Sequence, residues 1–342
     1  MTIDETFMHR CLQLAELGRG KVAPNPMVGA VLVHDNIIIG EGYHKEYGQA
    51  HAEVNCVNSV SEKEQPLIPF STLYVSLEPC AHFGKTPPCT AFIIKHQIHK
   101  VVIGCSDIYD EVNGKGITIL REAGIHVIVG VLEPVCLEMN IRFFTFHQKK
   151  RPYIILKWAQ SMDSHIAGAG KRQVAISGEA SARLVHRWRT EESAILVGTQ
   201  TALIDDPRLT ARLWEGKNPV RLVIDSTLKL PKDLQLFDQE VETIVFNVLK
   251  DEQERKTRFY KLATTDVKSL VQACYDLNLQ SVLVEGGASL LQSFIEEDLY
   301  DEIRVTTNTA LTLPGGLAAP GLKKVTLKKQ EWLATDLIQY YS

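Results

Sequence analysis

Three short segments in the first half of the chain carry residue types that can bind a metal and move protons. They are His51-Ala52-Glu53, Pro79-Cys80, and Cys89 after two prolines. One imidazole and two thiolates form a ligand set for catalytic zinc, which keeps a fourth position open for water. The metal lowers the pKa of that water, so hydroxide forms near neutral pH, and a carboxylate that is not a ligand shuttles protons. The pattern predicts a zinc-dependent deaminase, with His51, Cys80 and Cys89 as metal ligands and Glu53 as the catalytic proton carrier.

The spacing between the two cysteines departs from the usual deaminase pattern. The second cysteine normally follows the first after two residues, but here residues 81–88 intervene. Taken singly, His51 is compatible with an ordinary surface or core histidine, and Cys80 and Cys89 with buried thiols. Their order and the flanking prolines favour the metal site. A helix beginning after Pro88 would favour the thiolate form of the nearby cysteines.

Length and composition describe an ordinary globular chain. The 342 residues predict about two domains. With a net charge of -4, we expect neither nucleic acid nor a membrane as a partner. The apolar runs are too short to span a bilayer, and the N-terminal pattern predicts no signal peptide, so the expected location is cytoplasmic. Seven scattered cysteines argue against a disulfide framework, and most are expected to be buried thiols.

The first half alternates helix and strand patterns, which predicts a layered α/β sheet. We expect helices at residues 4–18, 51–60, 90–95 and 117–123, and strands at 29–34, 37–41, 72–76, 101–105 and 127–131. The basic run HQKKRP at 147–152 predicts a short linker between domains 1–147 and 148–342; the alternative is a surface loop within one domain.

The second half repeats this alternation. We expect strands at 153–158, 194–198, 221–224, 243–247, 281–285 and 302–307, and helices at 179–191, 267–277 and 288–297. Ser177 is the expected N-cap of the first helix, and Thr201 and Asp205 are expected in a loop. Gly286 and Gly287 separate a strand from a helix, which allows a phosphate to approach the backbone; the alternative is an ordinary turn.

Several motifs together resemble the bifunctional riboflavin-biosynthesis deaminase–reductase family over essentially the whole chain. The long spacer ends in the Thr-Pro-Pro-Cys segment that this family carries. The matching motifs are Pro24-Asn25-Pro26-x-Val28-Gly29, Gly42-x-His44, Gly48-x-x-His51-Ala52-Glu53, Thr86-Pro87-Pro88-Cys89 and Asn113-Gly114-Lys115-Gly116. In the second half they are Lys157, Ser161-Met162-Asp163, Arg189, Thr201, Asp205, Leu209, Arg212 and Glu285-Gly286-Gly287.

This resemblance implies a fold, two cofactors and a substrate. The fold would be α/β, with an N-terminal cytidine-deaminase-like three-layer αβα domain and a C-terminal dihydrofolate-reductase-like α/β domain. The enzyme would use Zn²⁺ and NADPH. It would deaminate the small-molecule phosphoribosyl-pyrimidine 2,5-diamino-6-(5-phosphoribosylamino)pyrimidin-4-one and then reduce the ribosyl group to ribityl. We expect a homo-oligomer.

The resemblance also implies roles for individual residues. Deaminase substrate contacts would come from Asn25, His44, His82 and Lys85. NADPH contacts would come from Gln160, Thr201, Asp205, Ser226, Gly287, Ala288, Ser289 and Leu290. Reductase substrate contacts would come from Lys157, Arg189, Leu209, Arg212 and Glu285, because paired arginines suit a phosphate.

Three positions depart from the family pattern. Gln173 and Ala175 stand where the family has Ser and Trp, and Ser164 replaces a glycine. Gln173 and Ala175 motivate an alternative in which the second domain is a non-catalytic binding or oligomerisation module. A weaker alternative is a deaminase of a free nucleoside or of tRNA, although the acidic balance of the chain counts against tRNA.

Overall fold

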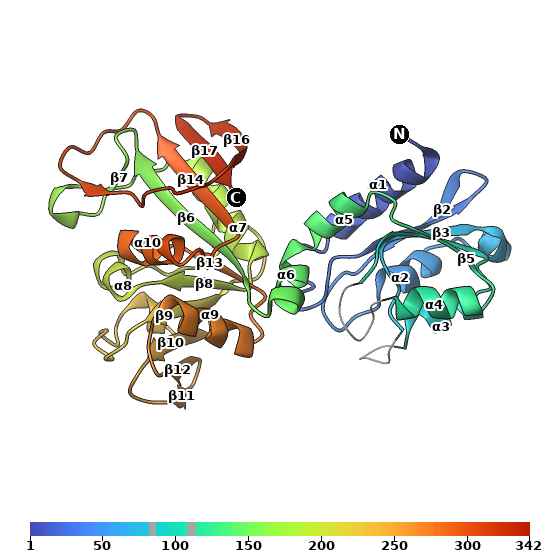
Figure 1. Ribbon diagram of the computed structural model, residues 1–342, viewed down its shortest axis with the longest axis horizontal. Coiled ribbons are helices and arrows are strands. Elements are labelled where there is room, and N and C mark those ends of the chain that lie inside the picture. The colour runs from blue at the N-terminus through green and yellow to red at the C-terminus, as the bar shows by residue number, and fades with distance from the viewer. Residues whose placement is uncertain (82–86, 108–113) are drawn as a thin grey trace. The chain divides into compact units, whose positions relative to one another are not determined.

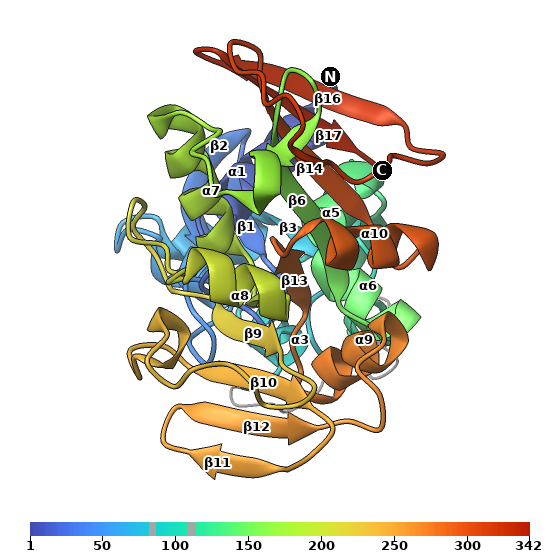
Figure 2. The ribbon, with the colours of Figure 1, turned by 90° about the vertical axis from the view of Figure 1, so that its left-hand side faces the viewer.

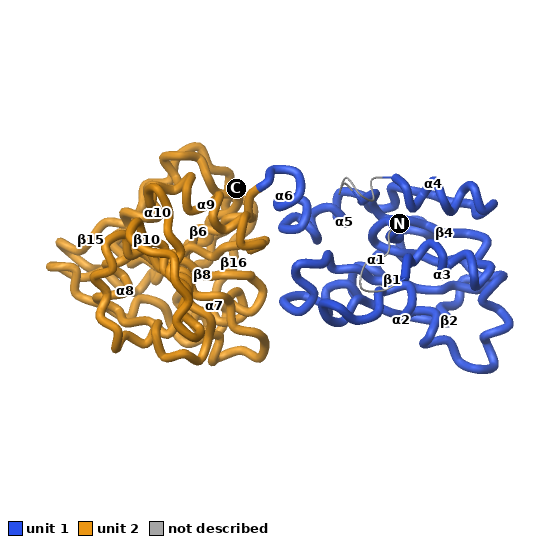
Figure 3. Tube along the Cα trace, turned by 90° about the horizontal axis from the view of Figure 1, so that it is seen from below, with its two compact units in different colours: residues 1–150 blue, residues 151–342 orange. Residues whose placement is uncertain are grey.

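The computed structural model describes residues 1–81, 87–107 and 114–342. It divides the chain into two compact units, Met1–Lys150 and Arg151–Ser342 (Figure 3). Residues 147–149 of the expected linker are helical, because they form the last turn of α6 (Ile141–Lys149). That helix buries Phe143 and Phe144 in the core of the first unit. The division therefore falls three residues beyond the expected end at 147.

The first unit contains a five-stranded sheet in the order β2-β1-β3-β4-β5. Its strands are β1 (Gly29–His34), β2 (Ile37–Tyr43), β3 (Thr72–Leu77), β4 (Lys100–Cys105) and β5 (His126–Val129). β1 pairs antiparallel with β2 and β3, whereas β3, β4 and β5 are parallel. Asp35 and Asn36 form the β1–β2 turn, both with positive φ, so the two strands expected at 29–34 and 37–41 form a hairpin.

Helices cover both faces of this sheet (Figure 1). They are α1 (Ile3–Glu16), α2 (Ala52–Asn58), α3 (Cys89–Lys95), α4 (Lys115–Glu122), α5 (Glu133–Met139) and α6, with a 3₁₀ turn at Gln65–Phe70. Along β3, Leu73 and Val75 join the core under α2, α3 and α4, while Tyr74 and Leu77 join the core under α1, α5 and α6. This alternation makes the unit a three-layer αβα domain, as expected. The helices α5 and α6 were not expected.

The second unit is built on a ten-stranded sheet in the order β11-β12-β10-β9-β8-β13-β6-β14-β17-β16. Its strands are β6 (Tyr153–Ser161), β8 (Ala194–Val197), β9 (Val220–Ile224), β10 (Thr243–Asn247), β11 (Glu252–Glu254), β12 (Thr257–Lys261), β13 (Ser281–Val284), β14 (Glu302–Asn308), β16 (Leu327–Leu333) and β17 (Asp336–Tyr341). The strands from β12 to β14 are parallel, and β11, β16 and β17 add antiparallel edges. A separate two-stranded ribbon joins β7 (His165–Ala167) and β15 (Leu317–Ala318).

Helices also cover both faces of the larger sheet. They are α7 (Glu179–Glu191), α8 (Thr199–Asp205), α9 (Val267–Asp276) and α10 (Ala288–Glu296), with 3₁₀ turns η2 (Ala169–Lys171) and η3 (Gln235–Phe237). α9 and α10 bury apolar side chains against one face. On the other face, the guanidinium of Arg304 from β14 lies 4.7 Å from the Trp188 ring centroid of α7. Figure 2 shows α7 and α10 on opposite sides of the sheet.

Two local expectations for the second unit were wrong. Thr201 and Asp205 lie within the helix α8 rather than in a loop. Gly178, not Ser177, is the N-cap of α7, and its N–H donates to the Asp336 carboxylate at 2.8 Å. A carboxylate that is distant in sequence thus accepts the backbone N–H of the N-cap residue itself. No helix among the described residues combines the length and apolar character needed to cross a bilayer.

Candidate active sites

The three predicted metal ligands lie together in the first unit. The ligand atoms of His51, Cys80 and Cys89 are all within 4.8 Å of one another. The Nδ1 atom of His51 lies 3.2 Å from Cys89 Sγ and 3.5 Å from Cys80 Sγ. His51 is the N-cap of α2, and Cys89 is the first residue of α3, where its N–H donates to Cys80 Sγ at 3.3 Å. One imidazole nitrogen and two sulfurs at this separation form a donor set that fits zinc.

The protonation of the two thiols is coupled. The hydrogen bond from Cys89 lowers the pKa of Cys80 to about 4, and the same contact raises the pKa of Cys89. Hydrogen bonding to Cys80 also raises the pKa of His51. These shifts favour a thiolate at Cys80, which is the form of cysteine that binds a metal.

Glu53 lies beside this cluster and is not one of the three ligands. It follows His51 in the first turn of α2, and its side chain is buried and contacts the Cys89 thiol. Burial, reinforced by the neighbouring Cys80, raises the pKa of Glu53 to about 7. A buried carboxyl next to the metal ligands is the group that can accept and return a proton in this site.

Two of the expected substrate contacts border the ligand cluster. The Nδ2 atom of Asn25 lies 3.1 Å from His44 Nε2. The His44 ring packs edge-on to the His51 ring, with 5.4 Å between centroids. Burial lowers the pKa of His44, which favours the neutral ring. The other two expected contacts, His82 and Lys85, lie outside the described residues.

Glu78 helps to hold the loop that carries the ligand Cys80, and this role was not predicted from the sequence. Its buried carboxylate accepts three backbone N–H groups, from Asp107 and Gly114 at 3.1 Å and from Ile117 at 3.2 Å. This ties the start of α4 to the end of β3. A Cβ atom on Gly116 would lie 2.2 Å from the Pro79 carbonyl oxygen, so only glycine permits this close approach of α4 to the ligand loop.

A cavity of about 470 Å³ lies in the second unit. Six of the residues predicted from the sequence line it: Arg189, Thr201, Asp205, Leu209, Arg212 and Glu285. Thr201 Oγ1 accepts a hydrogen bond from the Gly287 N–H at 2.8 Å, which joins the turn before α10 to the start of α8. Both turns follow neighbouring parallel strands, and the carboxyl ends of such strands are where α/β sheets bind ligands.

A buried cluster of charges joins two residues of the cavity lining, Arg189 and Glu285, to Lys157, which is not among the lining residues. Arg189 donates from Nε and Nη2 to the two Glu285 oxygens at 3.0 and 2.9 Å. Lys157 Nζ lies 3.7 Å from the same carboxylate. Burial alone would raise the pKa of Glu285, but attraction to Arg189 and Lys157 outweighs it and lowers the pKa to about 2. Burial lowers the pKa of Lys157.

The other expected NADPH contacts are not among the cavity-lining residues. They are Gln160, Ser226, Gly287, Ala288, Ser289 and Leu290. Gln160 Nε2 donates to Thr307 Oγ1 at 3.2 Å, and the hydroxyls of Ser226 and Thr265 are 2.6 Å apart. The cavity wall also includes Gln173, one of the departures noted in the sequence.

Comparisons with known proteins match both units. Residues 1–105 match the cytidine and deoxycytidylate deaminase zinc-binding region, and residues 152–335 match the RibD C-terminal domain. The riboflavin biosynthesis protein RibD of Aquifex aeolicus is 37% identical, covering 99% of this chain and 98% of its own length. This chain belongs to the RibD family. It is a bifunctional enzyme of riboflavin biosynthesis, with a zinc-dependent deaminase and an NADPH-dependent reductase of dihydrofolate-reductase-like fold.

Two further RibD proteins extend the comparison. The Escherichia coli RibD is 34% identical over 94% of this chain and 93% of its own length. A solved Thermotoga maritima structure is described as a diaminohydroxyphosphoribosylaminopyrimidine deaminase/5-amino-6-(5-phosphoribosylamino)uracil reductase. It superposes with a TM-score of 0.91 at 36% identity, covering 99% of this chain and 98% of that one.

The sequence interpretation did not identify Arg208 and Gln235 as residues of the reductase cavity, although both line it. Arg208 directly precedes Leu209, which was predicted as a substrate contact, so its position in the sequence could have identified it as a residue of the same site. Gln235 follows an ordinary loop and is 29 positions from its main partner, Asp206. No local pattern could have identified it.

Proposed function

We propose that this protein catalyses two consecutive steps on a phosphoribosylated pyrimidine. The first replaces the exocyclic amine of 2,5-diamino-6-(5-phosphoribosylamino)pyrimidin-4-one by oxygen and releases ammonia. The second reduces the ribosyl group to ribityl. The cluster of His51, Cys80 and Cys89 around a buried Glu53 carries the first assignment, and the reductase cavity supports the second.

In the deaminase, His51, Cys80 and Cys89 would hold zinc, which activates water as the nucleophile when bound. Glu53 takes the proton that the attacking water loses and delivers it to the departing amine, so water enters and ammonia leaves. His44, which packs against His51, and Asn25, which is hydrogen-bonded to His44, would contact the pyrimidine. His82 and Lys85 would also contact the substrate.

In the reductase, NADPH supplies hydride to the carbonyl carbon of the opened ribose. Lys157, Arg189 and Glu285 form one charged cluster, and we assign them, with Leu209 and Arg212, to the ribose phosphate. Thr201, Asp205 and the turn at Gly287 would contact the cofactor, together with Gln160, Ser226, Ala288, Ser289 and Leu290. The hydrogen bond between the Gly287 N–H and Thr201 holds these two segments together, which supports assigning both to the cofactor.

The decisive experiment uses the purified full chain and the diaminopyrimidinone phosphate, with and without NADPH. We expect ammonia release in both cases and NADPH oxidation that depends on the pyrimidine. Ammonia without any NADPH oxidation would leave the second unit as a binding or oligomerisation module. Calorimetry of NADPH with the full chain then distinguishes a module that binds the nucleotide from one that does not.

We extend the proposal to assembly and location. β16 is an edge strand of the larger sheet and exposes Trp332, which is 59% accessible. An unpaired edge with an apolar side chain favours association into a homo-oligomer. Light scattering during gel filtration tests this, and a monomer at micromolar concentration would refute it. The seven free cysteines suit a reducing, cytoplasmic compartment.

A further inference from the structure

Three carboxylates (Asp205, Asp206 and Glu285) and three arginines line the reductase cavity, and among the described residues Arg189 is the one of these arginines that forms an ion pair. The three arginines are Arg189, Arg208 and Arg212. Arg189 is bound at two points to Glu285 and donates from Nη1 to the Thr210 carbonyl at 3.0 Å. Its guanidinium is therefore already engaged by groups inside the protein. In the described part of the chain, no carboxylate lies within ion-pair distance of Arg208 or Arg212.

Arg208 is held in place by a neutral partner. Its Nε donates to Gln235 Oε1 at 2.5 Å. A bond to an amide oxygen orients the guanidinium without neutralising it. Among the described residues Nη1 and Nη2 have no hydrogen-bond or ion-pair partner, and the Asp238 carboxylate attracts the guanidinium from beyond ion-pair distance. An oriented guanidinium with two free terminal nitrogens is a donor pair for a phosphate.

Gln235 is itself fixed to the cavity wall. Its backbone N–H donates to Asp206 Oδ1 at 2.7 Å, and its Nε2 donates to the Asp206 carbonyl at 2.6 Å and to Oδ2 at 3.2 Å. Asp206 and Leu209 flank Arg208 and both have positive φ. A positive φ in a residue other than glycine costs free energy, and it persists where surrounding contacts hold the backbone in that conformation. The three bonds from Gln235 provide that constraint.

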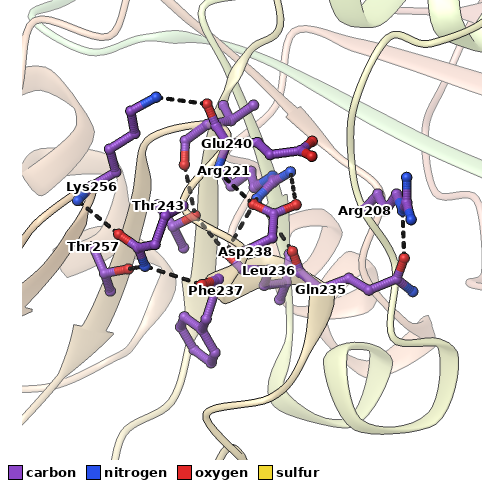
Figure 4. Close-up of polar contacts among 12 residues, drawn as sticks. Arg208, Arg221, Gln235, Leu236, Phe237, Asp238, Glu240, Thr243, Lys256 and Thr257 are labelled. Carbon is purple, nitrogen blue, oxygen red and sulfur yellow. Dashed lines mark hydrogen bonds and ion pairs between the residues drawn. The ribbon is translucent and has the colours of Figure 1, made fainter.

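Figure 4 shows the polar contacts that hold Gln235 and the rest of η3 in place. Arg221 of β9 is fully buried and binds both Asp238 oxygens, at 2.7 and 3.1 Å. Its Nη1 also donates to the carbonyls of Gln235 and Leu236 at 3.3 Å. Thr243 of β10 donates to the same Leu236 carbonyl at 2.7 Å. The central sheet thus anchors η3, and η3 anchors the Asp206–Arg208 turn.

We propose that Arg208 contacts a phosphate monoester in the reductase cavity and that Gln235 is the residue that positions it. This inference rests on the proposed reductase function. The proposed ligands of the reductase carry two phosphate monoesters, namely the 2′-phosphate of NADPH and the 5′-phosphate of the substrate. Both offer the same dianionic oxygens to a guanidinium.

The test compares Arg208→Gln with the full-length parent in steady-state reduction. If Arg208 contacts the cofactor, the KM for NADPH rises about tenfold or more at low salt, while the KM for NADH, which lacks the 2′-phosphate, is unchanged. If it contacts the substrate, the KM for the phosphorylated pyrimidine rises by a similar factor, while that for its dephosphorylated form is unchanged. Either result supports the proposal.

Two further variants separate position from charge. Gln235→Leu keeps Arg208 but removes its orienting bond, so we expect the same phosphate-selective rise in KM, with kcat within about twofold. Arg183→Gln removes an exposed arginine of α7 that does not line the cavity, and we expect no selective change. Equal KM changes with and without the phosphate, or no change in Arg208→Gln, would overturn the proposal.

The parent enzyme tests the proposed reductase function, and the Arg208→Gln variant tests the phosphate contact. A parent enzyme that oxidises no NADPH would refute the reductase assignment. A parent that is active, with an Arg208→Gln variant that matches it on all four ligands, would refute only the phosphate contact. Calorimetry of NADPH and NADH with both proteins gives the same comparison without turnover.

Discussion

Arg189 and Glu285 form a two-point ion pair between α7 and the end of β13, although 96 positions separate them in the sequence. Both side chains are nearly buried, at 12% and 10% exposure. Lys157 shares the carboxylate. One buried carboxylate therefore pairs with two cationic side chains.

Replacing this carboxylate should destabilise the second unit in a pH-dependent way. Glu285→Gln leaves Arg189 and Lys157 unbalanced, which costs about 3–5 kcal/mol near neutral pH. The pKa of Glu285 is about 2 in the folded protein against an ordinary 4.5. Because the folded pKa is the lower, the stabilisation is complete above pH 4.5 and is lost as the pH falls towards 2.

Urea unfolding followed by tryptophan fluorescence measures this loss, since all four tryptophans lie in the second unit. Between pH 6 and pH 3.5, the difference in free energy of unfolding between parent and Glu285→Gln should shrink by about 1.4 kcal/mol. The exposed Glu215→Gln serves as the control and should match the parent at both pH values. A difference that does not vary with pH would contradict the assignment.

Zinc content should depend on the three ligands. We expect about one zinc per chain in the parent and little in His51→Ala or Cys80→Ser, measured by plasma mass spectrometry, because three protein ligands are needed to retain catalytic zinc. Cys274→Ser, which changes a buried thiol of the second unit, should keep its zinc. NADPH oxidation with the deaminated substrate should continue in all of them. Full zinc occupancy in His51→Ala would refute the site.

Glu53→Gln should separate metal binding from proton transfer. The variant keeps the three ligands and hence its zinc, but it lacks the group that carries the proton, so ammonia release should fall by about 10²–10⁴-fold. Glu62→Gln, an exposed glutamate of the same unit, should release ammonia at the parental rate. A Glu53→Gln enzyme with parental activity would assign the proton transfer elsewhere.

Glu78→Ala should weaken the support of the Cys80 loop. Three backbone N–H groups lose their acceptor, which we expect to cost about 2–4 kcal/mol in the first unit. Glu78→Gln retains one acceptor oxygen and should be intermediate. Calorimetric unfolding and ammonia release are the measurements, with NADPH oxidation by the second unit as the internal reference. Parental stability in Glu78→Ala would show that water replaces the carboxylate.

Local patterns predicted much of the fold. Leu73, Tyr74 and Val75 form a continuous apolar run that is buried on both faces of the sheet, as in a parallel strand between two helical layers, so most of the parallel strands were correctly expected. The edge strand β16 was missed because its lysines and glutamate conceal any alternation on a surface that is mostly exposed. α8 was missed because a helix of only seven residues after Gly198 resembles a loop in residue type.

The sequence by itself determined which chemistry the first unit can perform. A histidine, a glutamate and two cysteines have donor atoms and proton affinities that belong to the residue types, and His51 and Glu53 are close enough along the chain to share one helical turn. Folding decided what else meets at each site. Glu78 reaches Gly114 and Ile117, Arg189 reaches Glu285, and Gln235 reaches Asp206 only because strands and helices bring distant segments together. Periodicity records whether a side chain is buried but does not record its partner, so these contacts appear only in the tertiary structure.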